Sequence, residues 1–160
     1  MTERIRAPFL WARGALAGVL FAASAGVALG QGLPIRAVQV TGQANRDLKM
    51  LAPVVRQQLV SQLGPRYEPG VRGGATLVVN LTSVDFPVDT DGGDFVSFNG
   101  ELDVLTGTIR LIGPGGRTIT AFPLQAQSNS VNASDEYQAP TPARLNSIAY
   151  TYAHWVVGKL

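Results

Sequence analysis

The sequence predicts an α+β domain built on a four-stranded mixed sheet, with elements in the order β-α-β-β-β-α and two helices on one face. Three observations lead to this fold class. A strand-like stretch precedes an apolar stripe with helical spacing, three alternating stretches separated by turn residues come next, and a second helical stripe ends the sequence. A linking helix makes the first two strands parallel, and hairpins make the later neighbours antiparallel.

The first strand and the first helix are predicted from hydrophobic periodicity. Residues 35–42 alternate in polarity and end on a glycine, which is typical of a strand. The helical stripe that follows consists of Leu48, Leu51, Ala52, Val55, Leu59 and Leu63. Because Pro53 has no amide hydrogen and is tolerated best in a first turn, we expect the regular helix to begin near Lys49. Gly64 and Pro65 should end this helix.

The second and third strands are predicted at residues 75–86 and 95–113. In the second strand, alternate residues such as Leu77 and Val79 should share one face. In the third strand the apolar positions change parity next to Gly107. A shift of one residue moves side chains to the opposite face, so this change predicts a β-bulge in the third strand beside the glycine.

A tight turn at 113–116, with the sequence GPGG, should lead into a fourth strand at residues 117–128. Pro123 cannot donate a backbone hydrogen bond, so this strand should lie at an edge of the sheet or contain a bulge.

The last helix should begin with Thr141 as its N-cap and Pro142 in its first position, and run to Leu160. Its predicted apolar stripe consists of Leu145, Ile148, Ala149, Tyr152, Trp155 and Val156. If Tyr150 and Trp155 are exposed, they should mark a surface for a protein partner, because aromatic side chains are enriched at interfaces.

Residues 1–30 resemble a secretory signal peptide, followed by a single domain at residues 31–160. Three arginines in the first thirteen residues precede an uncharged run from Gly14 to Gly30, which ends in small residues. We expect cleavage before Gln31 and a periplasmic protein. The alternative is a retained membrane anchor, but the run is shorter than the roughly 20 residues that a spanning helix needs.

Charge and cysteine content exclude several classes of function. The chain has 13 Lys and Arg against 11 Asp and Glu; three of these basic residues and one acid lie within residues 1–30, which leaves ten of each sign. The basic residues are scattered, so nucleic acid is not an expected partner. There is no cysteine, so the protein has no disulfide and no site for a lipid anchor on cysteine.

The acid-rich segment at residues 85–94 suggests two interpretations. Its aspartates and glycines are the residue types of a calcium loop, but the spacing lacks the closing acid of an EF-hand. The same residues are common at hairpin tips. We expect residues 87–94 to form a mobile tip without a tightly bound metal, and we keep a calcium-binding periplasmic protein as an alternative.

Few residues suggest catalysis, and we assign no catalytic, cofactor or metal-binding residue. Glu101 and Asp103 are two apart on a strand, about 7 Å, which keeps a secreted hydrolase as an alternative. His154 is the single histidine, and without a partner cysteine or histidine it cannot form a zinc site. Ser147 is seven residues away on the same helix, and no nucleophile motif surrounds it, so a structural or surface histidine is favoured.

The order of elements behind an export signal resembles small exported proteins of the bacterial cell envelope. They include auxiliary lipoproteins of outer-membrane assembly, lipid transport and cell-wall synthase activation. This chain departs from them in lacking the lipidated cysteine. The resemblance implies a non-catalytic binding or assembly module whose partner is an envelope protein or complex. Because the sequence contains no cofactor-binding loop, we expect no cofactor.

Overall fold

A computed structural model describes residues 32–87, 102–129 and 140–160 and confirms the predicted fold class and element order. The strands are β1 (Ile35–Thr41), β2 (Ala75–Asp85), β3 (Leu102–Ile112) and β4 (Thr118–Asn129). The helices are α1 (Arg46–Leu63), a short 3-10 turn, η1 (Gly64–Arg66), and α2 (Pro142–Gly158).

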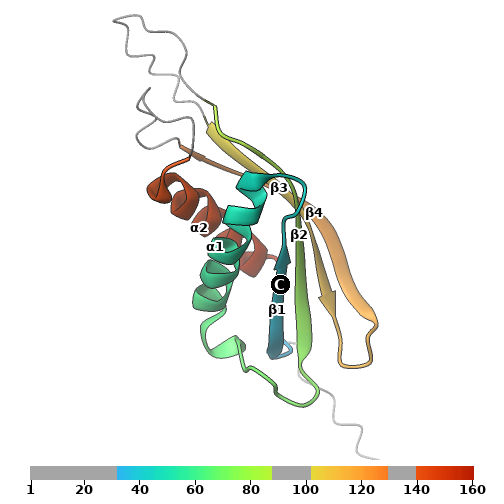
Figure 1. Ribbon diagram of the computed structural model, residues 1–160. Helices are drawn as coiled ribbons and strands as arrows, with labels where there is room; N and C mark the ends of the chain where they lie inside the picture. The colour runs from blue at the N-terminus through green and yellow to red at the C-terminus, as the bar shows by residue number, and fades with distance from the viewer. Residues whose placement is uncertain (1–31, 88–101, 130–139) are drawn as a thin grey trace, which may run out of the picture.

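The strands form one sheet in the order β1-β2-β3-β4. β1 and β2 are parallel, whereas the other two pairs are antiparallel. Both helices lie on the same face of the sheet, and the opposite face carries no described element (Figure 1). Within the three described stretches, no helix combines the length and the apolar character that crossing a membrane requires.

The expected start of the first helix near Lys49 is wrong, because α1 begins at Arg46. The Asn45 side chain caps the helix by accepting a hydrogen bond of 2.8 Å from the backbone N–H of Leu48. Pro53 therefore lies inside the helix, where it removes one backbone hydrogen bond. Its exposed side chain and the buried leucines on the opposite face allow the helix to continue through it.

The parity change predicted in the third strand occurs instead in its neighbour. Alternate residues of β3, from Asp103 to Leu111, are buried throughout its described length. The register shifts on β2, where Leu81 pairs with Gly107 and Ser83 with Thr106, so Thr82 is the extra residue of the bulge. The predicted strand residues 95–101 lie outside the described residues.

β4 is an edge strand, as the proline predicted, and Pro123 pairs with Thr108 of β3. The turn at 113–116 is also confirmed. The Gly113 N–H donates to the Arg117 carbonyl at 2.8 Å, and Gly116 has a φ of 78°, which favours glycine.

The predicted start of the last helix is correct. Thr141 precedes α2, and its side chain accepts a hydrogen bond of 3.3 Å from the Arg144 N–H. The helix ends at Gly158, two residues before the expected Leu160.

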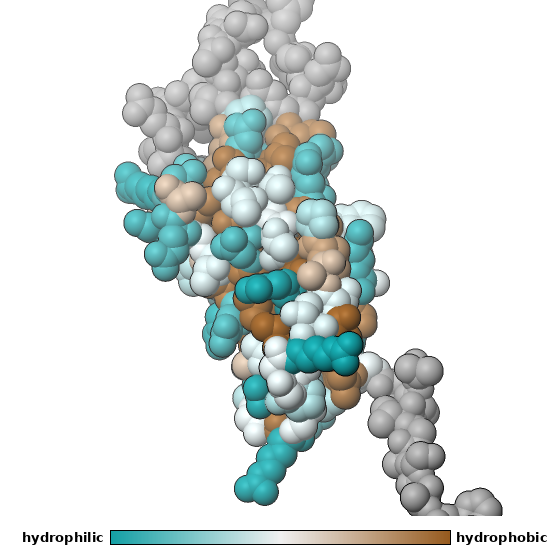
Figure 2. Space-filling model, turned by 90° about the vertical axis from the view of Figure 1, so that its right-hand side faces the viewer, coloured by the Kyte–Doolittle hydropathy of each residue, from teal (hydrophilic) through white to brown (hydrophobic). Residues whose placement is uncertain are grey.

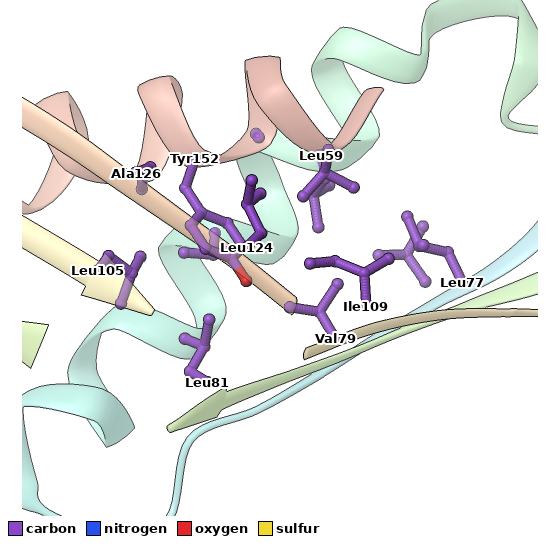
Figure 3. Close-up of a cluster of buried hydrophobic side chains, with 14 of the residues drawn as sticks. Leu59, Leu77, Val79, Leu81, Leu105, Ile109, Leu124, Ala126 and Tyr152 are labelled. Atoms are coloured by element: carbon purple, nitrogen blue, oxygen red, sulfur yellow. The ribbon is translucent and has the colours of Figure 1, made fainter. Parts of the chain in front are cut away.

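The core fills the space between the two helices and the sheet (Figure 3). Tyr152 extends from α2 toward the sheet and lies among Leu81, Leu105 and Leu124. The tip of its ring reaches β3 at Gly107, where a Cβ atom would lie 2.4 Å from the tyrosine oxygen. A glycine at this position therefore allows the close approach of helix and strand.

Candidate functional site

The acid-rich segment contributes little to the described structure. Asp85 ends β2 and is exposed, and Phe86 and Pro87 follow it. The mobile tip is expected at residues 87–94 and the calcium alternative at residues 85–94. Residues 88–94 lie outside the described stretches. Those expectations remain predictions.

Asp103 forms a buried ion pair with Arg144, the third residue of α2. The aspartate is fully buried and the arginine is 6% exposed. Arg144 Nη2 donates to Asp103 Oδ1 at 2.5 Å, and Nε lies 3.2 Å from both carboxylate oxygens. Nη2 also donates to the Pro87 carbonyl at 2.9 Å, and the guanidinium lies 5.3 Å from the centre of the Phe86 ring.

This ion pair anchors the first turn of α2 to the start of β3 and the end of β2. A cation is unfavourable near a helix N-terminus, and the Asp103 carboxylate offsets that cost. Asp103, one of the two acids of the hydrolase alternative, is therefore not exposed to solvent, and Glu101, the other, lies outside the described residues. A carboxylate with both oxygens bound to a guanidinium is a structural group rather than an exposed acid for hydrolysis.

His154 and Ser147 have different surroundings. His154 is exposed, and its ring packs edge-on against the ring of Trp155, with 6.1 Å between the ring centres. The Ser147 hydroxyl pairs at 2.7 Å with the hydroxyl of Ser128 on β4, which links α2 to the sheet. Among the residues that the structure describes, no three His, Asp or Glu side chains gather to form a metal site.

The Tyr152 hydroxyl is the most unusual polar group of the core. The residue is fully buried, and its oxygen has no hydrogen-bond partner among the described residues. Burial disfavours the charged form and raises the pKa of Tyr152 well above its ordinary value. Because the phenol is neutral and has no hydrogen-bond partner among the described residues, we assign it to packing.

Two exposed aromatic residues on α2 remain as candidate functional residues. Tyr150 is 56% exposed and Trp155 is 52% exposed, so Trp155 does not belong to the buried stripe, contrary to prediction. Five positions along a helix correspond to a rotation of about 140°, so the two side chains lie on different sides of α2. They therefore mark two surfaces rather than one.

The first surface, which we call the tyrosine surface, is the outer side of α2 around Tyr150. The Gln62 side chain of α1 donates to the Tyr150 carbonyl at 3.0 Å. This bond joins α1 to α2 at the backbone of Tyr150.

The second surface, which we call the β4 edge surface, lies where Trp155 approaches the edge strand. Trp155, Gln125, Ala126 and Gln127 line an open hollow of about 380 Å³. Figure 2 shows the side of the molecule on which β3 and β4 form their hairpin in Figure 1. Separate hydrophobic patches lie there among hydrophilic and neutral side chains, so this side is neither uniformly charged nor uniformly apolar.

Sequence reasoning identified the aromatic residues but missed their environments. Trp155 has helical spacing from the core residues, and only the position of β4 decides that it lies beside the sheet edge. The Asp103–Arg144 pair joins positions 41 residues apart in the sequence. In the sequence, the one sign of this pair was that Asp103 has the same strand parity as the apolar residues after Gly107. The bulge predicted in β3 placed Asp103 on the opposite face and so hid this sign.

Comparisons with known proteins show a shared fold at low sequence identity. No protein-family model matches the chain, and no curated protein matches its sequence. The solved structure of a hypothetical protein from Chlamydia trachomatis is 7% identical, has a TM-score of 0.50, and aligns with 80% of this chain and 95% of its own.

Two further solved structures are similar to this chain. A candidate lipoprotein from Caulobacter crescentus is 12% identical with a TM-score of 0.48, and the match covers 76% of this chain and 86% of that one. A minor lipoprotein from Acinetobacter baumannii is 12% identical with a TM-score of 0.49, and the match covers 78% and 91%. At these identities, the comparisons concern the fold and do not transfer a function.

Proposed function

We propose that this protein is a non-catalytic binding or assembly module of the bacterial cell envelope, exported to the periplasm and acting through contacts with other proteins. Its export is inferred from residues 1–30, whose basic start, uncharged run and small-residue end fit a cleaved signal. Cleavage before Gln31 leaves a domain with equal numbers of basic and acidic residues, which suits contacts other than those with nucleic acid.

The observation that carries the proposal is the exposure of Tyr150 and Trp155 on two sides of one helix. Large aromatic side chains stabilise interfaces because they bury much area at a low cost in conformational entropy. Single exposed apolar residues are common on protein surfaces. Here, however, the backbone carbonyl of Tyr150 is bound by Gln62 of α1, which fixes α2 against α1 at this exposed residue, and Trp155 lines a hollow beside an edge strand. Two such surfaces suit a protein that connects partners.

The burial of Asp103 argues against the hydrolase alternative. It required Asp103 as a solvent-facing acid, and Asp103 is fully buried against Arg144. Contacts through the tyrosine surface therefore have better support as the basis of function.

Affinity capture from solubilised envelope extracts tests the proposal. The processed protein and a Gln57→Ala control should recover the same envelope protein, and Tyr150→Ala should lose it. Gln57 is a suitable control because it is exposed on the other helix, α1, whereas His154 lies one turn from Tyr150 on the same side of α2. Recovery of no specific protein under several detergents, or equal recovery by Tyr150→Ala, would contradict the proposal.

Protein chemistry on the exported form tests its localisation. N-terminal sequencing of the purified protein should begin at Gln31, and the protein should be released with the periplasmic contents. A chain that begins at Met1 and remains in the membrane fraction would show that the retained anchor is correct.

A further inference from the structure

The two edges of the sheet are protected to different extents. At the β1 edge, the carbonyls of Ile35 and Arg36 accept hydrogen bonds from the N–H groups of Glu68 and Gly70, at 3.0 and 3.2 Å. That edge is short, carries a charge, and is partly covered by the segment after η1. At the other edge, β4 is twelve residues long and contains no charged residue. Among the described residues, no strand pairs with its outer side.

The alternation of backbone groups in β3 shows which groups of β4 face outward. The Thr106 carbonyl accepts a hydrogen bond of 3.2 Å from the Thr82 hydroxyl on β2, so Thr106 directs its backbone toward β2. Thr108 has the same parity and does likewise. Their partners on β4, Gln125 and Pro123, therefore point their backbone groups away from β3. A proline fits this position because it withdraws no N–H from the β3–β4 pairing.

This alternation makes the stretch from Pro123 to Asn129 self-complementary. Gln125, Gln127 and Asn129 present both N–H and C=O groups outward, whereas Pro123 presents only its carbonyl. In an antiparallel pairing centred on Ala126, Gln125 of one copy faces Gln127 of the second copy. Asn129 then faces Pro123 of the second copy, where its N–H can donate to the proline carbonyl.

The position of Trp155 coincides with the centre of this pairing. The hollow that Trp155 lines is formed on β4 by Gln125, Ala126 and Gln127, the three residues around the axis. A two-fold axis at Ala126 would bring both tryptophans over the paired strands and bury their exposed faces. Because β4 carries no charge, two copies can approach at this edge without repulsion between like charges along the strand.

We propose that the β4 edge surface binds a second copy of this chain, through antiparallel pairing of β4 with β4 around Ala126. The result is a continuous eight-stranded sheet with both α2 helices on one face. This inference goes beyond the proposed function, since the tyrosine surface remains available for an envelope partner. It does not depend on that partner.

Light scattering and tryptophan fluorescence of the processed protein test the inference. The average mass should rise toward twice the monomer mass as the concentration increases from micromolar to millimolar. Trp11 belongs to the predicted signal, so Trp155 is the single tryptophan of the processed chain. Its emission should shift to shorter wavelength over the same concentration range.

Two matched proline variants assign the contact to the pairing stretch. Gln127→Pro removes an outward N–H at the centre and should keep the protein monomeric, with an unchanged circular dichroism spectrum. Ala121→Pro removes an outward N–H on the same strand beyond Pro123 and should dimerise as the parent does. If Gln127→Pro is unfolded, Trp155→Ala replaces it, and the mass should again fall toward that of the monomer.

Three results would overturn the inference. The first is a parent protein that stays monomeric at millimolar concentration. The second is a folded Gln127→Pro variant that dimerises like the parent. The third is co-purification of a different polypeptide that Gln127→Pro loses, which would assign this edge to that polypeptide. None of these results affects the capture experiment at Tyr150, so the two proposals fail independently.

Discussion

Replacing Gly107 with alanine should destabilise the fold through two contacts made by a single added atom. A Cβ at this position would lie 2.4 Å from the Tyr152 hydroxyl oxygen and 2.8 Å from the Asn80 carbonyl oxygen. The Tyr152 ring is fully buried and cannot move into solvent. The Asn80 carbonyl belongs to β2, which pairs on both sides, so its movement would disturb the sheet.

The size of the effect follows from overpacking and from backbone entropy. Overpacking a well-filled core costs about 1–3 kcal/mol, and a contact with backbone places this site toward the upper end. Replacing glycine in a strand returns about 0.5–1 kcal/mol because the unfolded chain loses conformational freedom. We therefore expect Gly107→Ala to lower the free energy of unfolding by about 1–2 kcal/mol. In a domain of this size, the melting temperature should fall by about 4–8 °C.

A double-mutant cycle with Tyr152→Phe tests this reasoning. Tyr152→Phe removes an oxygen that has no partner among the described residues, so it should stabilise the parent by about 1 kcal/mol. It should also recover part of the loss caused by Gly107→Ala, because the contact with Asn80 remains. Urea unfolding of the four proteins gives the coupling energy, which we expect to be about 1 kcal/mol. An unchanged stability of Gly107→Ala, or an equal loss in both backgrounds, would refute the proposed contact.

Three further predictions concern pH, charge and metal. Burial raises the pKa of Tyr152 in the folded state. The free energy of unfolding should therefore not depend on this group below pH about 10. Above that pH it should decline, because the tyrosine ionises in the unfolded chain but not in the folded one. Chemical unfolding at pH 9 to 11 should show this decline, and Tyr152→Phe should reduce its slope; an identical slope would contradict the raised pKa. Arg144→Ala should cost about 3–5 kcal/mol by removing the guanidinium that binds the buried Asp103 carboxylate. Arg144→Met with Asp103→Leu should recover most of that loss, and Arg110→Ala, at an exposed position, should change little. If the exposed variant is as unstable as Arg144→Ala, the buried pair has no special role. Finally, millimolar calcium should leave the melting temperature unchanged relative to chelator. A true calcium site in residues 85–94 would add about 2.7 kcal/mol to the free energy of unfolding at a hundredfold excess over its dissociation constant. A rise in melting temperature that disappears when the aspartates of this segment are replaced by asparagine would establish calcium binding.

The fold was predictable because its main signals are local. Turn residues, the helical stripes and the capping residues Asn45 and Thr141 act within a few positions of one another. The predicted start of α1 near Lys49 rests on the rule for Pro53 alone, whereas the cap at Asn45 sets the start at Arg46. The bulge lies on β2 rather than β3, because β3 keeps one parity throughout its described length: it buries the charged Asp103 and exposes the apolar Leu102, which reverses the expected pattern before Gly107.

The candidate surfaces were predictable only as residue types. An aromatic residue at core spacing is predicted to be buried, and Trp155 is exposed because α2 lies beside an edge strand rather than over the middle of the sheet. Likewise, Asp103 is an ordinary strand acid in the sequence. Its role depends on Arg144, which the fold places beside it from another element.

Site-specific photo-cross-linking in living cells tests the central claim, that α2 presents two separate protein-binding surfaces. A cross-linking amino acid would replace Tyr150, Trp155 or, as a control, the exposed Gln57 of α1. We predict that position 150 captures another envelope protein, that position 155 captures a second copy of this chain, and that position 57 captures neither. Absence of adducts at both aromatic positions, or the same adducts at all three positions, would contradict the account.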